Sequence, residues 1–221
     1  MALQSIESLT VLAAALFAVS CSTPNERAQA RLQPEYDPAG KLTLLRFDSD
    51  GDARTDMWSY MDGARIVRIE IDSNGDGTID RWEHYGADQK LAKVGFSREH
   101  DGVEDAWSYD DASGAIARIE ISTRRDGAVD RIEHYQHDQM VSAEEDTDHQ
   151  GGVDKWEIYD DGRLVSVAFD TTGRGTPDRR LRYAADGGAT LEVDPDGDGV
   201  FVASDHRTSA GEAKGAKGLQ E

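Results

Sequence analysis

Apolar and polar residues alternate in short segments through the middle of the chain. In one segment Val67, Ile69 and Ile71 fall on one side, with Arg68 and Glu70 between them. The same spacing returns at Ala92, Val94 and Phe96, and at Val165, Val167 and Phe169. Because successive side chains of a strand point to opposite faces, a period of two predicts β-strands. No convincing helical period is found in this region.

Tight turns separate paired segments of this kind. Asp62-Gly63 and Asp161-Gly162 each stand between two such runs. Asp-Gly is typical of two-residue hairpin turns, in which both residues take positive φ. The segments on either side of each turn are therefore predicted to pair as β-hairpins.

Polar, Asp-rich loops join one hairpin to the next at a regular spacing. The loops begin at steps of 24 or 25 residues, at Asp48, Asp72, Ser97, Ser122, Asp146, Asp170 and Asp194. A longer period is also present, since Trp58-Ser59-Tyr60 returns as Trp107-Ser108-Tyr109. The pattern predicts an all-β fold, an antiparallel meander of β-hairpin repeats with acidic loops along one edge. Whether this solenoid-like or superhelical sheet stays open, folds into a sandwich or closes is not decided by the sequence.

The loop that begins at Asp72 carries oxygen ligands at alternate positions. Asp72, Asn74, Asp76 and Asp80 stand at positions 1, 3, 5 and 9, and Thr78 offers a backbone carbonyl at position 7. Glu83 follows at position 12. Calcium is a hard cation that takes six to eight oxygen ligands, so this spacing predicts a Ca²⁺ site.

This loop matches the whole EF-hand loop pattern, but its flanks are strand-like rather than helical. It resembles more closely the calcium loops of FG-GAP (integrin-type) and VCBS repeats, which join two strands. The resemblance covers the loops alone, because the repeat here is much shorter than those blades. It implies Ca²⁺ as the ligand and leaves the biological role open.

Two other loops have good ligand sets, and four are degenerate. The predicted ligands are Asp48, Asp50, Asp52 and Asp56 in one loop and Asp194, Asp196, Asp198 and Asp205 in the other. The Ser97 and Asp146 loops keep several acids. The loops with Arg124, Arg125 and Arg174 are expected to be metal-free, the arginine supplying its own cation. The aspartate at position 9 persists even there, which favours a second interpretation, a carboxylate that accepts loop N–H groups without metal.

Charge and composition narrow the class of protein. The 221 residues carry a formal net charge of -20, from 44 acidic and 24 basic residues. Such a chain repels nucleic acid, and no nucleic-acid partner is expected. Only 38% of the residues are hydrophobic, which predicts a thin core or one stiffened by ions. No catalytic motif emerges, and the regular spacing of the acids fits a repeated part better than the catalytic carboxylate pair of an envelope hydrolase, so no enzyme is predicted.

The four tryptophans share one position of the repeat. Trp58, Trp82, Trp107 and Trp156 would form a ladder across the sheet. The favoured interpretation is core packing. The alternative is a sugar platform, which would make the chain a carbohydrate-binding module for cell-wall or other glycans.

The N-terminus reads as a targeting segment. An uncharged, mostly apolar run covers residues 9–19. At its end, Ala18-Val19-Ser20-Cys21 resembles a bacterial lipobox with a lipid on Cys21. An ordinary signal peptide or an uncleaved anchor is the alternative. Ser22, where aspartate would signal inner-membrane retention, favours the outer membrane or cell surface. The predicted division is a signal peptide (1–20), a flexible tether (21–40), the repeat domain (41–202) and a disordered tail (203–221). We expect a calcium-binding, non-catalytic lipoprotein of the cell envelope with a protein or glycan partner.

Overall fold

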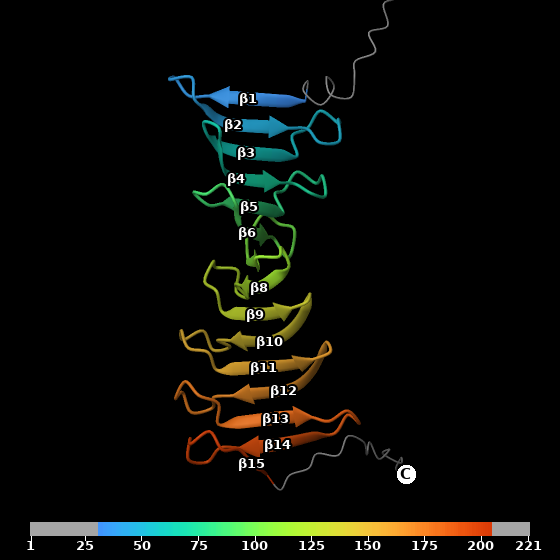
Figure 1. The fold of residues 1–221 in the computed structure, drawn as a ribbon, viewed down its shortest axis with the longest axis vertical. Coiled ribbons are helices and arrows are strands. Elements are labelled where there is room, and N and C mark those ends of the chain that lie inside the picture. The colour runs from blue at the N-terminus through green and yellow to red at the C-terminus, as the bar shows by residue number, and fades with distance from the viewer. Residues whose placement is uncertain (1–30, 205–221) are drawn as a thin grey trace, which may run out of the picture.

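The chain forms one sheet of fifteen antiparallel strands in a computed structural model that describes residues 31–204. Strand order in the sheet follows sequence order throughout (Figure 1). The strands are β1 (Leu32–Tyr36), β2 (Leu42–Phe47), β3 (Met57–Asp62), β4 (Arg65–Ile71), β5 (Arg81–Tyr85), β6 (Leu91–Phe96), β7 (Ala106–Asp110), β8 (Ile116–Ile121), β9 (Arg131–Gln136), β10 (Gln139–Glu145), β11 (Lys155–Asp160), β12 (Arg163–Phe169), β13 (Arg179–Tyr183), β14 (Ala189–Val193) and β15 (Val202–Ala203). The predicted all-β meander is confirmed.

The sheet is an open single layer. Among residues 31–204, the backbone of each strand pairs only with the strands before and after it in the sequence. β1 and β15 lie at opposite ends, and the strands around β6 to β8 are seen more nearly end-on than those at either end (Figure 1). The meander therefore twists along its length without closing into a barrel or folding into a sandwich. Within the described residues no helix is long and apolar enough to cross a membrane.

The sheet begins earlier than the alternation pattern predicts. β1 lies inside the segment 21–40 that we expected to be a tether, and it pairs with β2 from Leu32↔Phe47 to Tyr36↔Leu42. Pro34 argues against a central strand, but proline is tolerated at an edge because one side of an edge strand makes no ladder hydrogen bonds. β15 likewise runs one residue into the predicted tail. Cys21, the predicted lipidation residue, and the predicted signal peptide lie outside the described residues.

The register places the tryptophans in one row on one face. Trp58 pairs with Glu70, Glu70 with Trp82, Trp82 with Gly95, and Gly95 with Trp107. The predicted ladder is thus present, with the tryptophans on alternate strands. Trp82 and Trp107 are only 7% and 9% exposed, so their neighbours on the same face cover them even without a second layer. This burial supports the core interpretation for these two residues.

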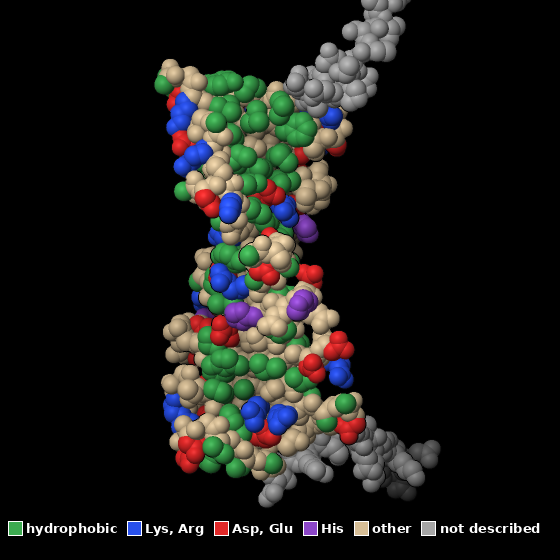
Figure 2. Space-filling model, in the orientation of Figure 1, with side chains coloured by type: hydrophobic (Ala, Val, Ile, Leu, Met, Phe, Trp, Pro, Cys, Tyr) green, Lys and Arg blue, Asp and Glu red, His purple; other side chains and the backbone are tan. Residues whose placement is uncertain are grey.

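Ion pairs and tyrosine hydroxyls cover much of both faces. On the tryptophan face, Arg68 pairs with Glu70 at 2.8 Å and lies over the Tyr60 ring, whose hydroxyl donates to Glu70 at 2.9 Å. The arrangement repeats one two-unit period later with Arg118, Glu120 and Tyr109. Figure 2 shows hydrophobic, acidic and basic side chains mixed over the visible face. Long side chains lying along the sheet replace the missing second layer.

The opposite face carries a charged network of its own. Arg131 donates to Glu133, Glu145 and Glu157 at 2.9, 3.0 and 2.9 Å. Lys155 pairs with Glu145 and Glu157 as well. Because all these side chains are mostly buried by one another, each charge is compensated where water is partly excluded.

The predicted hairpin turns are present, with one difference in conformation. Asp161 and Gly162 both take positive φ, as a type I′ turn requires. At Asp62-Gly63 only the glycine does, with φ 66°, and Asp62 still pairs with Arg65. The turn residues are therefore Gly63 and Ala64, which is the type II′ arrangement with glycine first.

Candidate metal-binding loops

Seven loops with one backbone conformation line one edge of the sheet. We number them first to seventh, and they cover residues 48–56, 72–80, 97–105, 122–130, 146–154, 170–178 and 194–202. In every loop the residues at positions 4 and 6 take positive φ. Glycine holds position 6 in all but the first loop, where Ala53 has φ 72°. The sequence spacing thus corresponds to one repeated loop geometry, whatever the side chains at the ligand positions.

The carboxylate at position 1 closes the loop. Asp72 accepts the N–H of Gly75 on Oδ1 at 2.8 Å and the N–H of Gly77 on Oδ2 at 2.7 Å. Bonds to positions 4 and 6 recur at Asp48, Asp170 and Asp194. Where serine replaces this aspartate, Ser97 Oγ accepts the N–H of Asp101 and Ser122 Oγ that of Gly127. Position 1 therefore has a structural role in the loop that needs no metal ion.

The aspartate at position 9 ties the end of the loop to its beginning. Asp80 Oδ1 accepts both the N–H and the hydroxyl of Ser73 at position 2. Equivalent bonds hold Asp56, Asp105, Asp130, Asp154 and Asp178. The second interpretation of the position-9 aspartate, a carboxylate that accepts loop N–H groups without metal, predicts hydrogen bonds of this kind. The second oxygen differs between loops, and Oδ2 of Asp80 and of Asp130 is buried without a hydrogen-bond partner.

Three loops bring three carboxylates together. In each of the three loops, one oxygen of each acid lies within 4.8 Å of the other two. The first set is Asp48, Asp50 and Asp56; the second is Asp146, Asp148 and Asp154; the third is Asp194, Asp196 and Asp198. Oxygens around one Ca²⁺, each about 2.3–2.6 Å from the ion, are separated by such distances. The first and seventh loops were predicted as sites, whereas the fifth was expected to be degenerate because Gln150 stands at position 5.

Other predicted ligands take different partners. Asp52 Oδ1 accepts the N–H of Arg54 at 2.7 Å and does not join the first-loop cluster. In the second loop, the best match to the calcium pattern, Asn74 Nδ2 donates to Asp76 at 3.0 Å. The Thr78 N–H lowers the pKa of Asp76. Glu83 lies on β5, where its two oxygens accept from Arg81 and Tyr85. Asp205 lies outside the described residues.

Loop N–H groups lower the pKa of two of the clustered acids, Asp146 and Asp194. Burial raises the pKa of Asp146 and of Asp194, but loop N–H groups outweigh it and hold both below the usual value. Among the donors, Gly151 bonds Asp146 and Gly199 bonds Asp194. An ionised carboxylate is the form that binds a cation, and Asp146 and Asp194 are in this form near neutral pH.

Arginine enters one loop from its neighbour. Arg125 belongs to the fourth loop, yet it pairs with three acids of the third loop, Glu99 at 2.9 Å, Asp105 at 3.0 Å and Asp101. The bond from Arg125 lowers the pKa of Asp101 to about 2. The sequence predicted that arginine would act within its own loop. The structure instead places its guanidinium between two loops, because sequence spacing does not show which neighbour a long side chain reaches.

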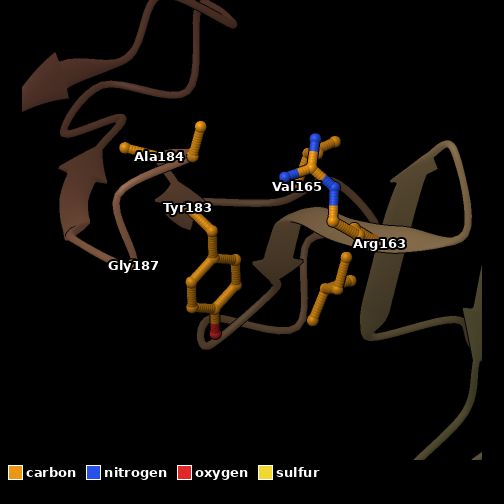
Figure 3. A pocket seen from close by; sticks show the side chains of 7 residues that line it. Arg163, Val165, Tyr183, Ala184 and Gly187 are labelled. Atoms are coloured by element: carbon orange, nitrogen blue, oxygen red, sulfur yellow. The ribbon is translucent and has the colours of Figure 1, made fainter.

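One hollow lies away from the acidic loops. It has a volume of about 500 Å³ and lies at the hairpin edge between the start of β12 and the β13–β14 turn. Arg163, Val165, Tyr183, Ala184 and Gly187 line it (Figure 3). With one arginine and one tyrosine among small and apolar residues, it brings together no acid–base pair and no nucleophile.

Comparison with known proteins adds little. No family model and no curated protein matches the chain. One solved structure that matches is "Crystal structure of accessory secretory protein 1,2 and 3 in Streptococcus pneumoniae", with 12% identity and a TM-score of 0.20. The match covers 75% of this chain and 19% of that one, so this chain spans about a fifth of that protein's length. A likeness at this TM-score carries no argument about fold or function.

Proposed function

We propose that this chain is a calcium-binding, non-catalytic repeat lipoprotein of the bacterial cell envelope, with a structural or interaction role. The observation that carries the proposal is the presence of three carboxylate clusters on loops that share one backbone conformation. The proposal gives the first, fifth and seventh loops the strongest sites. The lipid on Cys21 and a location at the outer membrane or cell surface belong to the same proposal and derive from the N-terminal sequence.

Calcium is the favoured ion because every ligand in these clusters is a carboxylate oxygen. Hard cations prefer such oxygens, whereas zinc and copper sites draw on histidine and cysteine. Three converging carboxylates repel one another strongly at neutral pH. A divalent ion relieves this repulsion and orders the loop, so binding and folding should be linked.

The proposed role follows from the shape of the sheet. A single layer leaves both faces and both edges accessible along its whole length. An elongated surface of this kind suits contact with an extended protein or glycan partner. The burial of Trp82 and Trp107 weighs against the alternative of a sugar platform on the tryptophan row.

Titration calorimetry with Ca²⁺ after chelator treatment of the full chain tests the proposal. We expect binding by wild type and the loss of one site in Asp194→Asn. Asp186→Asn is the matched control, since Asp186 lies in the β13–β14 turn at the opposite edge and accepts only the N–H of Gly188. A wild-type chain that binds no calcium, or an Asp194→Asn variant that keeps every site, would contradict the proposal.

A further inference from the structure

Arginine and histidine side chains lie between consecutive loops at one repeated place. In the third, fourth and fifth loops the side chain at position 4 lies beside an acid of the preceding loop. In the fourth loop this residue is Arg125, and its guanidinium reaches the acids at positions 3, 5 and 9 of the third loop. The position-9 acid, Asp105, is 0% exposed and also pairs with Arg98 at 3.4 Å. The side chain of Arg125 thus reaches positions 3 and 9, which supply two of the three carboxylates in the cluster of the first loop, as well as position 5.

Histidines take the same place in two other loops. His100, at position 4 of the third loop, lies 3.5 Å from Asp80 Oδ2 of the second. His149, at position 4 of the fifth loop, lies 3.4 Å from Asp130 Oδ2 of the fourth. His100, Arg125 and His149 have φ of 54°, 60° and 59°, where the other loops have glycine. A non-glycine residue in this region costs free energy, so a role for the side chain in this place explains its presence.

In two of the four loops with glycine at position 4, an arginine from the preceding segment fills this place. Arg174, at position 5 of the sixth loop, lies beside Gly197 of the seventh, where a Cβ would come within 2.4 Å of its Nη1. Arg31 lies beside Gly51 of the first loop in the same way and donates to the carbonyl of Ser49 at 3.0 Å. A cation therefore occupies the place next to position 4 in these loops too.

Only two loops in the described part of the chain have neither arrangement at position 4. A Cβ added at Gly75 or at Gly173 would have no heavy atom within 4 Å other than those of the adjacent residues in the chain. The loops that precede them are the first and the fifth, and both carry a carboxylate cluster. The third cluster is in the seventh loop, which no further loop follows within residues 31–204. Within residues 31–204, a cluster is therefore found only in loops that have no arginine or histidine side chain between them and the loop that follows.

We propose that Arg125 is a built-in cation that replaces a metal ion in the third loop, and that the side chain at this place decides which loops bind metal. The inference rests on the proposed function for the first, fifth and seventh loops. A guanidinium presents five donors in a planar fork and stays charged at every accessible pH. Arg125 would thus hold the third loop, near the middle of this edge, at any calcium concentration. The carboxylate clusters of the first, fifth and seventh loops would instead respond to the ion.

Two opposite substitutions in the full chain test the inference by Ca²⁺ calorimetry and by the melting temperature in excess chelator. Arg125→Gly is expected to gain one calcium site and to melt lower in chelator than Arg124→Gly. Arg124 is the matched control because it lies in the same loop, is about half exposed and pairs only with Asp126. Gly75→Arg is expected to lose the first-loop site, while Gly75→Ala, which has the same backbone strain without a cation, keeps it.

The outcomes separate this inference from the proposed function. Equal stoichiometry and equal melting of Arg125→Gly and Arg124→Gly would overturn the inference, as would a Gly75→Arg chain that keeps every wild-type site. If wild type binds no calcium, the proposed function fails, and the melting temperatures in chelator alone decide whether Arg125 holds the third loop. If Arg125→Gly does not fold, Gly75→Arg decides the question.

Discussion

The indole Nε1 of Trp107 donates a hydrogen bond of 2.8 Å to Glu104 Oε1, and the same oxygen lies 2.7 Å from His84 Nε2. The Glu104 side chain lies over Gly95, the residue that separates Trp82 from Trp107 in their row. A Cβ at position 95 would come within 2.0 Å of Glu104 Oε1. The carboxylate therefore fills the gap that glycine leaves in the row and gives the buried indole a polar partner.

Gly95→Ala is expected to destabilise the protein. The added methyl must displace Glu104 and with it the hydrogen bond to Trp107, at a cost of about 1–3 kcal/mol, as for overpacking in a core. Chemical denaturation measures the change in the free energy of unfolding. Gly152→Ala is the control, because Gly152 has open space around it and lacks positive φ. Equal stability of the two variants would show that Glu104 does not hold this place.

Trp107→Ala is expected to lower the free energy of unfolding by roughly 3 kcal/mol, as for a buried aromatic residue. Ile158→Ala, on the same face but 48% exposed, should cost far less. Denaturant titration of both variants, together with a glycan-binding assay, distinguishes the two roles of the tryptophans. Loss of sugar binding with unchanged stability would support the platform and contradict the core role.

Chelation is expected to lower the melting temperature of wild type. An ion that binds only the folded chain adds about 2.7 kcal/mol per site at a hundred times its dissociation constant. Differential scanning calorimetry with calcium and with excess chelator measures the shift. The shift should shrink in Asp48→Asn, since Asp48 belongs to the first cluster, and should persist in Asp186→Asn. A melting curve that chelator leaves unchanged in wild type would show that the ion does not stabilise the fold.

Stability is expected to fall at alkaline pH as half-buried tyrosines ionise. Burial, followed by the bond from its hydroxyl to Glu133, raises the pKa of Tyr135 to about 12 from an ordinary value of 10.0, and Tyr85 beside Glu83 behaves alike. Because the folded-state pKa is raised, the contribution is complete below pH 10 and is lost as the pH rises toward 12. Denaturation across this window should show a shallower loss in Tyr135→Phe than in wild type. Parallel pH profiles would contradict the assignment.

Local patterns predicted most of the architecture. The alternation at Val67, Ile69 and Ile71 and the Asp161-Gly162 turn each determine structure through neighbouring residues, and the hairpins follow from them. β1 was missed because its pairing with β2, rather than any alternation of its own, makes it a strand. The open form of the sheet could not be predicted, since it depends on faces covered by charged side chains rather than by a second layer.

The candidate sites were predictable only in part. The spacing in each loop showed which oxygens are available, and it favoured the second loop over the fifth. Whether those oxygens converge depends also on the adjacent loop, two strands away, from which Arg125 and His149 extend. The signal was present in the sequence as a non-glycine residue at position 4, but the strand register was needed to show which loop it serves.

The backbone pairing of residues 31–204, which joins only adjacent strands, has a mechanical consequence. β1 and β15 lie at opposite ends of the long axis (Figure 1), so tension between them pulls along the direction of the inter-strand hydrogen bonds. Such a load strains one ladder at a time, and hairpins would peel away singly at low force. A chain attached to a membrane at one end and to a partner at the other would then lengthen in steps, each releasing about one repeat.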